Sequence, residues 1–175
     1  MSVTARQKTL LSLACAAVAA LSFTVSPAWA CDESDAQACW QDADTGVTQC
    51  FTDEATLDAA IESQTGSRLA APGSASRSSV VALTTYILAT WYEDSGYGGS
   101  FLKTTSTNSA ACTAGTINLN FPGAWNDRVS SYKTWYGCTG TIYQNTGQGG
   151  SSFGPSTAAS SVGGMNDQAS SYRLT

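Results

Sequence analysis

The stretch NDRVSSY, residues 126–132, returns near the carboxyl end of the chain as NDQASSY, residues 166–172. A second pair of stretches precedes these two in the same order: YEDSGYGGSF at 92–101 and YQNTGQGGSSF at 143–153. In each of the latter an aromatic residue is followed by a turn and a glycine pair. Because both elements occur twice and in register, we predict an architecture of two similar halves.

The segments around these repeats carry the signals of β-strands. From Val80 onward the chain is dense in Thr, Ser, Tyr, Trp and Gly, and it has no convincing helical period. Short strand-forming runs separated by glycine turns are typical of a β-sandwich or barrel. We therefore predict an all-β domain over residues 80–175.

The duplicated elements resemble those of the βγ-crystallin family. YEDSGYGG is similar to the family's folded-hairpin signature, and NDRVSS and NDQASS fit its calcium motif, N/D-N/D-x-x-S/T-S. The resemblance covers the chain from about Tyr86 to the carboxyl terminus. It implies a double Greek-key sandwich with two Ca²⁺ sites, each built from one motif's Asn-Asp segment and the other motif's hairpin.

The residue types at these positions suit calcium, a hard cation that takes about six to eight oxygen ligands. Two carboxylates, two hydroxyls and two backbone carbonyls come from the Asn-Asp segments, and the resemblance adds one carbonyl from each hairpin. The predicted metal-binding residues are Glu93, Asn126, Asp127, Arg128, Ser130, Gln144, Asn166, Asp167, Gln168 and Ser170. The alternative is ordinary turn chemistry, in which Asn, Asp and Ser side chains bond their own backbone.

With one formal negative charge per site, we expect dissociation constants on the order of 10⁻⁵ to 10⁻³ M, the range of extracellular modules. The two sites differ at one position, where the first motif has Arg128 and the second has neutral Gln168. We expect the first site to bind more weakly unless the guanidinium points to solvent.

The chain contains no histidine, which excludes Ser-His-Asp triads, Cys-His pairs and His-ligated zinc or iron sites. The remaining candidate for catalysis is a carboxylate pair. Glu93 and Asp94 are adjacent, so on a strand they would point to opposite faces. We predict that the protein has no catalytic residues and is not an enzyme.

Acidic residues are concentrated in the first part of the chain. Residues 31–70 hold nine acids and one base, whereas residues 86–175 hold four of each. Neither part has a basic patch that could hold nucleic acid, so we expect no nucleic-acid partner.

The first 30 residues have the pattern of a secretory signal peptide. Arg6 and Lys8 precede an apolar run, Leu10–Val25, which is followed by Ala28-Trp29-Ala30. The run is short for a membrane span. We therefore expect a secreted, extracellular protein with no membrane association after signal removal.

Five cysteines follow the predicted signal, in a compartment where disulfides persist. Local spacing favours a Cys39–Cys50 pair across a hairpin turning at residues 44–46, and a Cys112–Cys138 pair in the later domain. Three fates stay open for Cys31: a free thiol, an intermolecular bond, or replacement of one partner in the first pair.

Residues 31–65 are predicted to form a small acidic unit. It consists of the disulfide hairpin and a helix over about Asp53–Ser63, with Thr52 as N-cap and Gly66 as the stop. So short a unit rarely folds alone. It either docks on the next domain, depends on its disulfide, or is a removable pro-segment. Residues 66–79 are predicted to be an exposed linker.

The two halves differ in length, because 34 residues separate Tyr92 from Asn126 and 23 separate Tyr143 from Asn166. The leading hypothesis is a monomeric extracellular calcium-binding module. Secreted bacterial metalloprotease inhibitors and killer-toxin-like proteins of the crystallin fold are similar in size and disulfide use. An alternative is therefore inhibition of a secreted protease, or action on a cell-surface target, through the longer loop, residues 106–116. A glycan-binding or glycan-cleaving protein using Trp or Glu93 is a third reading.

Overall fold

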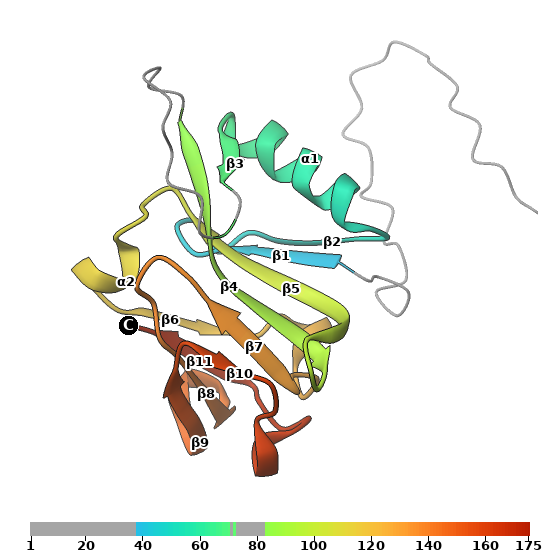
Figure 1. Ribbon diagram of the computed structural model, residues 1–175, viewed down its shortest axis with the longest axis vertical. Helices are drawn as coiled ribbons and strands as arrows, with labels where there is room; N and C mark the ends of the chain where they lie inside the picture. The colour runs from blue at the N-terminus through green and yellow to red at the C-terminus, as the bar shows by residue number, and fades with distance from the viewer. Residues whose placement is uncertain (1–37, 71, 73–82) are drawn as a thin grey trace, which may run out of the picture. The chain divides into compact units, whose positions relative to one another are not determined.

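The computed structural model describes residues 38–70, 72 and 83–175 (Figure 1). Its strands are β1 (Ala38–Asp42), β2 (Thr48–Phe51), β3 (Arg68–Ala70), β4 (Thr84–Asp94), β5 (Gly98–Ser106), β6 (Ile117–Asn120), β7 (Ser131–Thr134), β8 (Gly140–Asn145), β9 (Gly149–Ser156), β10 (Ala158–Ala159) and β11 (Ser171–Leu174). The helices are α1 (Glu54–Thr65) and the short α2 (Ala111–Ala114), with 3-10 turns η2 (Gly123–Trp125), η3 (Thr146–Gln148) and η4 (Gly163–Met165). The predicted signal peptide and Cys31 lie outside the described residues.

The strands form two sheets, and their order is that of two interlocked Greek keys. Sheet A has the order β10-β7-β4-β5-β1-β2, with β3 beside β4, and sheet B has the order β6-β11-β8-β9. The first motif is β4 to β7, but its third strand, β6, lies in sheet B beside β11. The second motif is β8 to β11, and its third strand, β10, lies in sheet A beside β7. The predicted all-β double Greek-key fold is confirmed.

The core between the sheets is built around Trp91, which is fully buried. Its ring lies 4.6 Å from that of Tyr172, 5.2 Å from that of Tyr132 and 5.3 Å from that of Phe121, measured between centroids. Burial raises the pKa of Tyr132 to about 12, and its hydroxyl donates to the Gly140 carbonyl at 2.7 Å. Tyr132 and Tyr172, which end the two repeats, are therefore packing residues of this core.

The amino-terminal segment is part of sheet A. Strand β1 lies between β2 and β5, antiparallel to β2 and parallel to β5. Alternate residues of β1 point to opposite faces: Cys39 joins the core between the sheets, whereas Ala38 and Trp40 join a second core with Leu57 and Ile61 of α1. The segment is docked on the following domain through β1 and the second core, and its Cys39–Cys50 disulfide is formed as well.

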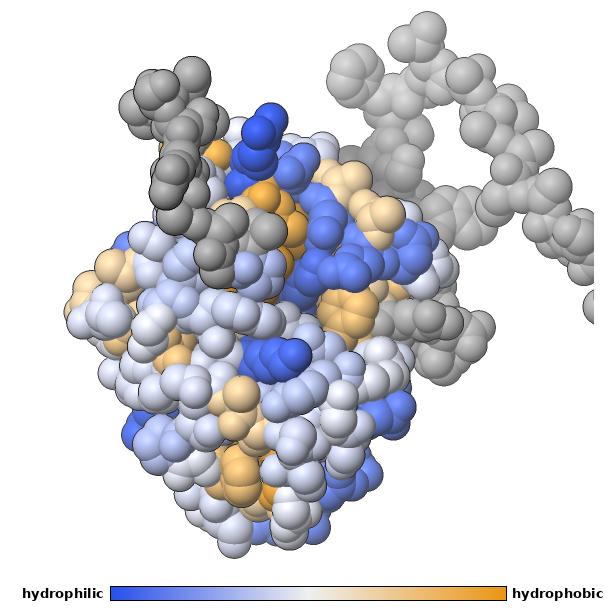
Figure 2. All heavy atoms as spheres, viewed as in Figure 1, coloured by the Kyte–Doolittle hydropathy of each residue, from blue (hydrophilic) through white to orange (hydrophobic). Residues whose placement is uncertain are grey.

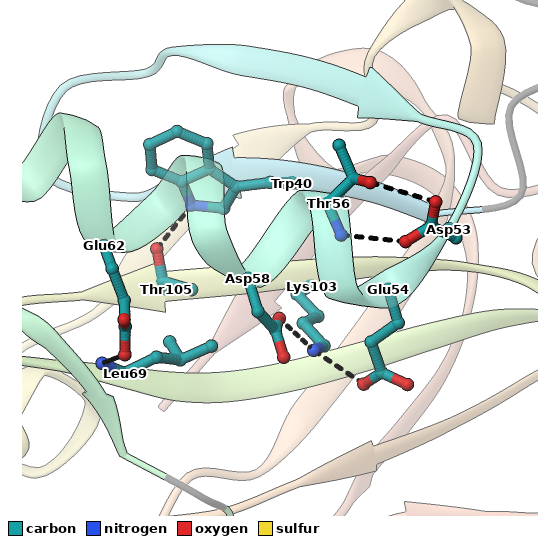
Figure 3. Close-up of polar contacts among 9 residues, drawn as sticks. All are labelled: Trp40, Asp53, Glu54, Thr56, Asp58, Glu62, Leu69, Lys103 and Thr105. Atoms are coloured by element: carbon teal, nitrogen blue, oxygen red, sulfur yellow. Dashed lines mark hydrogen bonds and ion pairs between the residues drawn. The ribbon is translucent and has the colours of Figure 1, made fainter.

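Helix α1 begins one residue later than its sequence signals suggested. Asp53, and not Thr52, is the N-cap, because its backbone is extended and its carboxylate accepts from the Thr56 amide at 2.8 Å (Figure 3). Gly66 ends the helix in the left-handed conformation, with φ 63°, as predicted.

The predicted linker is partly wrong. Its early residues Arg68–Ala70 form β3, which pairs in parallel with Thr84–Tyr86 of β4. This short pairing was not visible in the sequence, because a three-residue strand has no periodicity. Most of the remaining linker lies outside the described residues.

Both predicted disulfides, Cys39–Cys50 and Cys112–Cys138, are confirmed. The first joins the facing residues of β1 and β2. The second joins α2 to the connection between the motifs. No helix within the described ranges is long and apolar enough to span a membrane.

Candidate metal-binding site

The two Asn-Asp segments have the same local structure. Each follows a 3-10 turn, and Asp127 and Asp167 adopt left-handed backbone conformations with φ 57° and 53°. Aspartate tolerates this region better than most residues. The amide nitrogens of Asn126 and Asn166 donate to the following carboxylate at 2.6 Å. Each asparagine therefore orients the neighbouring aspartate.

The two segments meet, and each aspartate reaches the serine of the other motif. Ser170 Oγ lies 3.5 Å from Asp127 Oδ1, and Ser130 Oγ lies 3.4 Å from Asp167 Oδ1. Backbone bonds support the exchange: the Asp127 amide donates to the Ala169 carbonyl at 3.0 Å. The duplicated motifs thus contribute to two equivalent clusters of oxygen atoms.

Each serine remains beside the hairpin of its own motif. The Ser130 amide donates to the carbonyl of Tyr92, and the Ser170 amide donates to that of Tyr143, both at 2.9 Å. The resemblance implied sites built from one motif's Asn-Asp segment and the other motif's hairpin. In this structure the aspartate reaches the other motif, while the serine stays with the strand pair that carries it.

An open cavity of about 340 Å³ lies at the cluster that contains Asp127 and Ser170. Its lining residues are Asp127, Gln144, Asn145, Asp167, Gln168 and Ser170. Five of these six are among the predicted metal-binding residues. Asn145 was missed, although it follows Gln144 in the hairpin and corresponds to Asp94 in the first repeat.

The oxygen atoms available here suit a weakly held hard cation. The described residues contain no group of three or more His, Cys, Asp or Glu side chains that could hold a metal. Any ion in this cluster would depend on one or two carboxylates together with hydroxyl and carbonyl oxygens. Such a set suits Ca²⁺, which accepts carbonyls and water, better than zinc, which takes nitrogen and sulfur ligands.

In the first motif, the positive charge of Arg128 is paired with the carboxylate of Glu93. Its Nη2 lies 2.7 Å from Glu93 Oε1, and its Nη1 donates to the Ala124 carbonyl at 2.9 Å. The hydrogen bonds from Arg128 lower the pKa of Glu93, with a smaller contribution from Ser100. The guanidinium therefore neither points freely to solvent nor adds an uncompensated positive charge.

The folded hairpins explain the recurring glycine pairs. Gly99 and Gly150 have φ 74° and 76°, and a Cβ atom at Gly99 would lie 2.7 Å from Asp94 Oδ2. Only glycine fits both the conformation and the space. The last serine of each motif forms a hydrogen bond with the hairpin of the same motif. Ser131 Oγ donates to the Asp94 carbonyl at 2.6 Å, and Ser171 Oγ donates to the Asn145 carbonyl at 2.5 Å. These two serines have structural roles that sequence reasoning did not assign.

The longer loop of the first motif is held at two points. Cys112 binds Cys138, and Asp44 of the β1–β2 turn accepts bonds from Ser106 Oγ and from the Thr107 amide, both at 2.7 Å. The loop predicted at 106–116 is therefore shorter than expected, because Ser106 is the buried last residue of β5.

Solved structures similar to this chain include bacterial βγ-crystallin domains. One from Clostridium beijerinckii is 23% identical and has a TM-score of 0.39, and the match covers 50% of this chain and 95% of that chain. One from Flavobacterium johnsoniae is 24% identical with a TM-score of 0.37, covering 50% and 93%. No family model and no curated protein matches the sequence. The strand order identifies the fold as a double Greek key.

Proposed function

We propose that residues 83–175 form an extracellular calcium-binding module of the βγ-crystallin type, in which two ions stabilise the fold. The observation that carries the proposal is the exchange of aspartates between the motifs, seen in the facing pairs Asp127–Ser170 and Asp167–Ser130. An ion held by both members of a pair would join the two Greek keys.

The proposed ligands follow from this exchange. One site takes the carboxylate of Asp127, the hydroxyl of Ser170 and the carbonyls of Gln144 and Gln168. The other takes Asp167, Ser130 and the carbonyls of Glu93 and Arg128. Each set offers about four protein oxygens, so water would complete a shell of about six to eight.

The two asparagines have a different role in this proposal. Because the side chains of Asn126 and Asn166 already donate to the adjacent aspartates, they hold the carboxylates in place and need not touch the ion. Each cation would offset the negative charge of the aspartate at its own site, at the junction of the motifs. An ion that binds only the folded chain raises its stability by mass action.

Calcium titration by calorimetry, with thermal melts in excess calcium and in chelator, tests the proposal. We expect two binding events. At about 100 times the dissociation constant, each site should add about 2.7 kcal/mol to the free energy of unfolding. A chain with no binding heat and equal melting temperatures in calcium and chelator would contradict the proposal.

Single substitutions test which ligands share a site. Asp127→Asn and Ser170→Ala should remove the same binding event, although they lie in different motifs, and Asp167→Asn with Ser130→Ala should remove the other. If Asp127→Asn and Ser130→Ala instead abolish one common event, the exchange of aspartates is not part of the binding sites.

A further inference from the structure

A second cavity, of about 420 Å³, lies between helix α1 and the outer face of sheet A. It shares no lining residue with the cavity at the Asn-Asp segments. Its floor is formed by residues of β4 and β5, including Tyr92 and Phe101, and Trp135 from the connection after β7 also lines it. Its volume falls in the range of pockets that take ligands, about 300–1,000 Å³.

One border of this cavity, which we call the α1 groove, is acidic. Glu54, Asp58 and Glu62 all line it from one face of α1, four residues apart. Successive carboxylates on such a face are about 6 Å apart along the helix axis, at 1.5 Å per residue. Figure 3 shows the three side chains along the same side of the helix.

The structure contains one cation in the groove, and it is bound between two of these carboxylates. Lys103 Nζ lies 2.7 Å from Glu54 Oε1 and 2.6 Å from Asp58 Oδ1, and this lysine is 4% exposed. Within the described ranges, Glu62 accepts a hydrogen bond from the Leu69 amide, at 3.0 Å. Three carboxylates therefore face one ammonium, and the charge of Glu62 is not compensated by any cation of the described residues.

The uncompensated carboxylate shares its end of the groove with apolar and aromatic side chains. Leu69 of β3 pairs with Thr85, and the Trp135 amide donates to the Leu88 carbonyl, so both residues lie beside the first half of β4. Trp135 is partly buried, and Glu62 is exposed. On the face seen in Figure 2, strongly hydrophilic residues adjoin a hydrophobic patch. A carboxylate and an indole ring that line the same groove together favour a cationic side chain.

At the other end of the groove, a carboxylate again acts on an aromatic side chain. The pKa of Tyr92 is raised by burial and, to a smaller extent, by the charge of Glu54. Glu54 and Asp58 remain partly exposed, with side-chain exposures of 61% and 38%. They are thus accessible to a second cation in addition to Lys103.

We propose that the α1 groove binds an extended, basic segment of a partner protein. Side chains at alternate positions of an extended chain are about 6.6 Å apart on one face, which matches the spacing of the acids on α1. Lysine or arginine at such positions would meet the carboxylates, while the aromatic rings contact the aliphatic stems. A second copy of this chain is a poor occupant, because its formal net charge is -5.

The test uses the full mature protein in chelator, so that its result is independent of calcium binding. The probe is a fluorescein-labelled peptide of seven residues with arginine at positions two, four and six and alanine elsewhere, measured by fluorescence anisotropy. The matched probe has glutamine in place of each arginine. We expect saturable 1:1 binding of the arginine peptide, at least tenfold tighter than that of the glutamine peptide, and weaker in high salt.

Two variants locate the peptide. Glu62→Gln keeps an oxygen to accept the Leu69 amide but removes the charge, and Trp135→Leu removes the ring. Each should weaken binding about threefold or more, the effect of losing one ion pair or cation–π contact. Asp94→Asn, which removes one exposed carboxylate outside the groove, should change it less than twofold. Glu54 and Asp58 are left intact because Lys103 depends on them.

Four outcomes would overturn the proposal. The first is equal binding of the two peptides, and the second is an equal loss of peptide affinity in Glu62→Gln and Asp94→Asn. The third is binding of neutral chitohexaose with no binding of the arginine peptide. The fourth is self-association in sedimentation equilibrium that the Glu62→Gln substitution abolishes. The third would assign the groove to glycans, and the fourth would assign it to a second copy.

Discussion

Arg128 and Gln168 occupy the same position in the two motifs and make the same backbone contact. Arg128 Nη1 donates to the Ala124 carbonyl, and Gln168 Nε2 donates to that of Gly164 at 3.0 Å. Arg128 differs in one respect, because it also pairs with Glu93. The extra positive charge of the first motif is therefore matched by an extra negative one. Under the proposed function, the two sites should differ less in affinity than the sequence suggested.

Arg128→Gln should strengthen calcium binding severalfold at the proposed site that contains Asp167 and Ser130. It leaves the Glu93 carboxylate unpaired beside the proposed ligands, and an added negative charge favours a cation. Calorimetry on the variant measures the change, and Arg128→Gln with Glu93→Gln should return the affinity to near its original value. Weaker binding in the single variant would mean that the ion pair shapes the site more than its charge does.

The same pair gives the folded protein a pH dependence. Because the pKa of Glu93 is lowered from its usual 4.5, the ion pair contributes fully above that value and its contribution is lost as the pH falls through the folded-state pKa. Both side chains are partly exposed, with 27% and 36% of their surface accessible, so the contribution is small.

Helix α1 is attached to sheet A by apolar contacts and by one buried charge. Leu57 and Ile61 are fully buried against Trp40, whose Nε1 donates to Thr105 Oγ1 at 2.6 Å (Figure 3). Lys103 of β5 forms ion pairs with Glu54 and Asp58 of α1. The lysine is buried and its two carboxylate partners are not. The loss in free energy of unfolding should therefore differ between removal of the lysine charge and removal of the carboxylate charges.

For this element we predict that the double change Glu54→Gln and Asp58→Asn destabilises the protein more than Lys103→Met does. The double change leaves an ammonium group buried without a partner, which costs about 3 kcal/mol or more. Lys103→Met keeps the apolar stem and leaves two carboxylates that water can reach. Urea unfolding of both variants measures the free energies, and equal losses would show that Lys103 becomes solvated in the double variant.

On the scale of the whole molecule, the amino-terminal segment belongs to the same folded unit as the Greek keys. Strand β1 covers β5 along Phe101–Thr105. The Tyr172 hydroxyl, deep in the core, donates to Gln41 Oε1 at 2.8 Å, and the Gln41 amide donates to the Asn120 carbonyl at 3.0 Å. Hydrogen bonds from one β1 residue therefore reach both β11 and β6 of the other sheet.

We predict that a chain of residues 31–175 unfolds in a single transition and that a chain starting at Leu83 is less stable and self-associates. Removing β1 exposes the unpaired edge of β5, and exposed edges promote association between chains. Calorimetry and sedimentation measure the two effects. A shortened chain that stays monomeric with an unchanged melting temperature would show that the segment is an independent attachment.

What the sequence by itself determined is local. The repeated hairpins and Asn-Asp segments predicted two similar halves, and their resemblance to the βγ-crystallin motifs implied the double Greek key. Each repeat requires particular turn conformations at fixed spacing, as at Gly99 and Asp127. The helix stop at Gly66 followed from nearby residues in the same way, whereas the two disulfides were predicted from cysteine spacings of 11 and 26 residues. The turn and helix-stop signals depend on backbone geometry over a few residues, which the sequence encodes directly.

Only the tertiary structure decided which distant groups meet. The exchange of Asp127 and Asp167 between motifs, the Arg128–Glu93 pair and the insertion of β1 beside β5 each join residues at least 35 positions apart. The α1 groove likewise combines residues from helix, sheet and loop. Strand order and packing of the two cores determine these neighbours, and a single sequence carries no local pattern that specifies them.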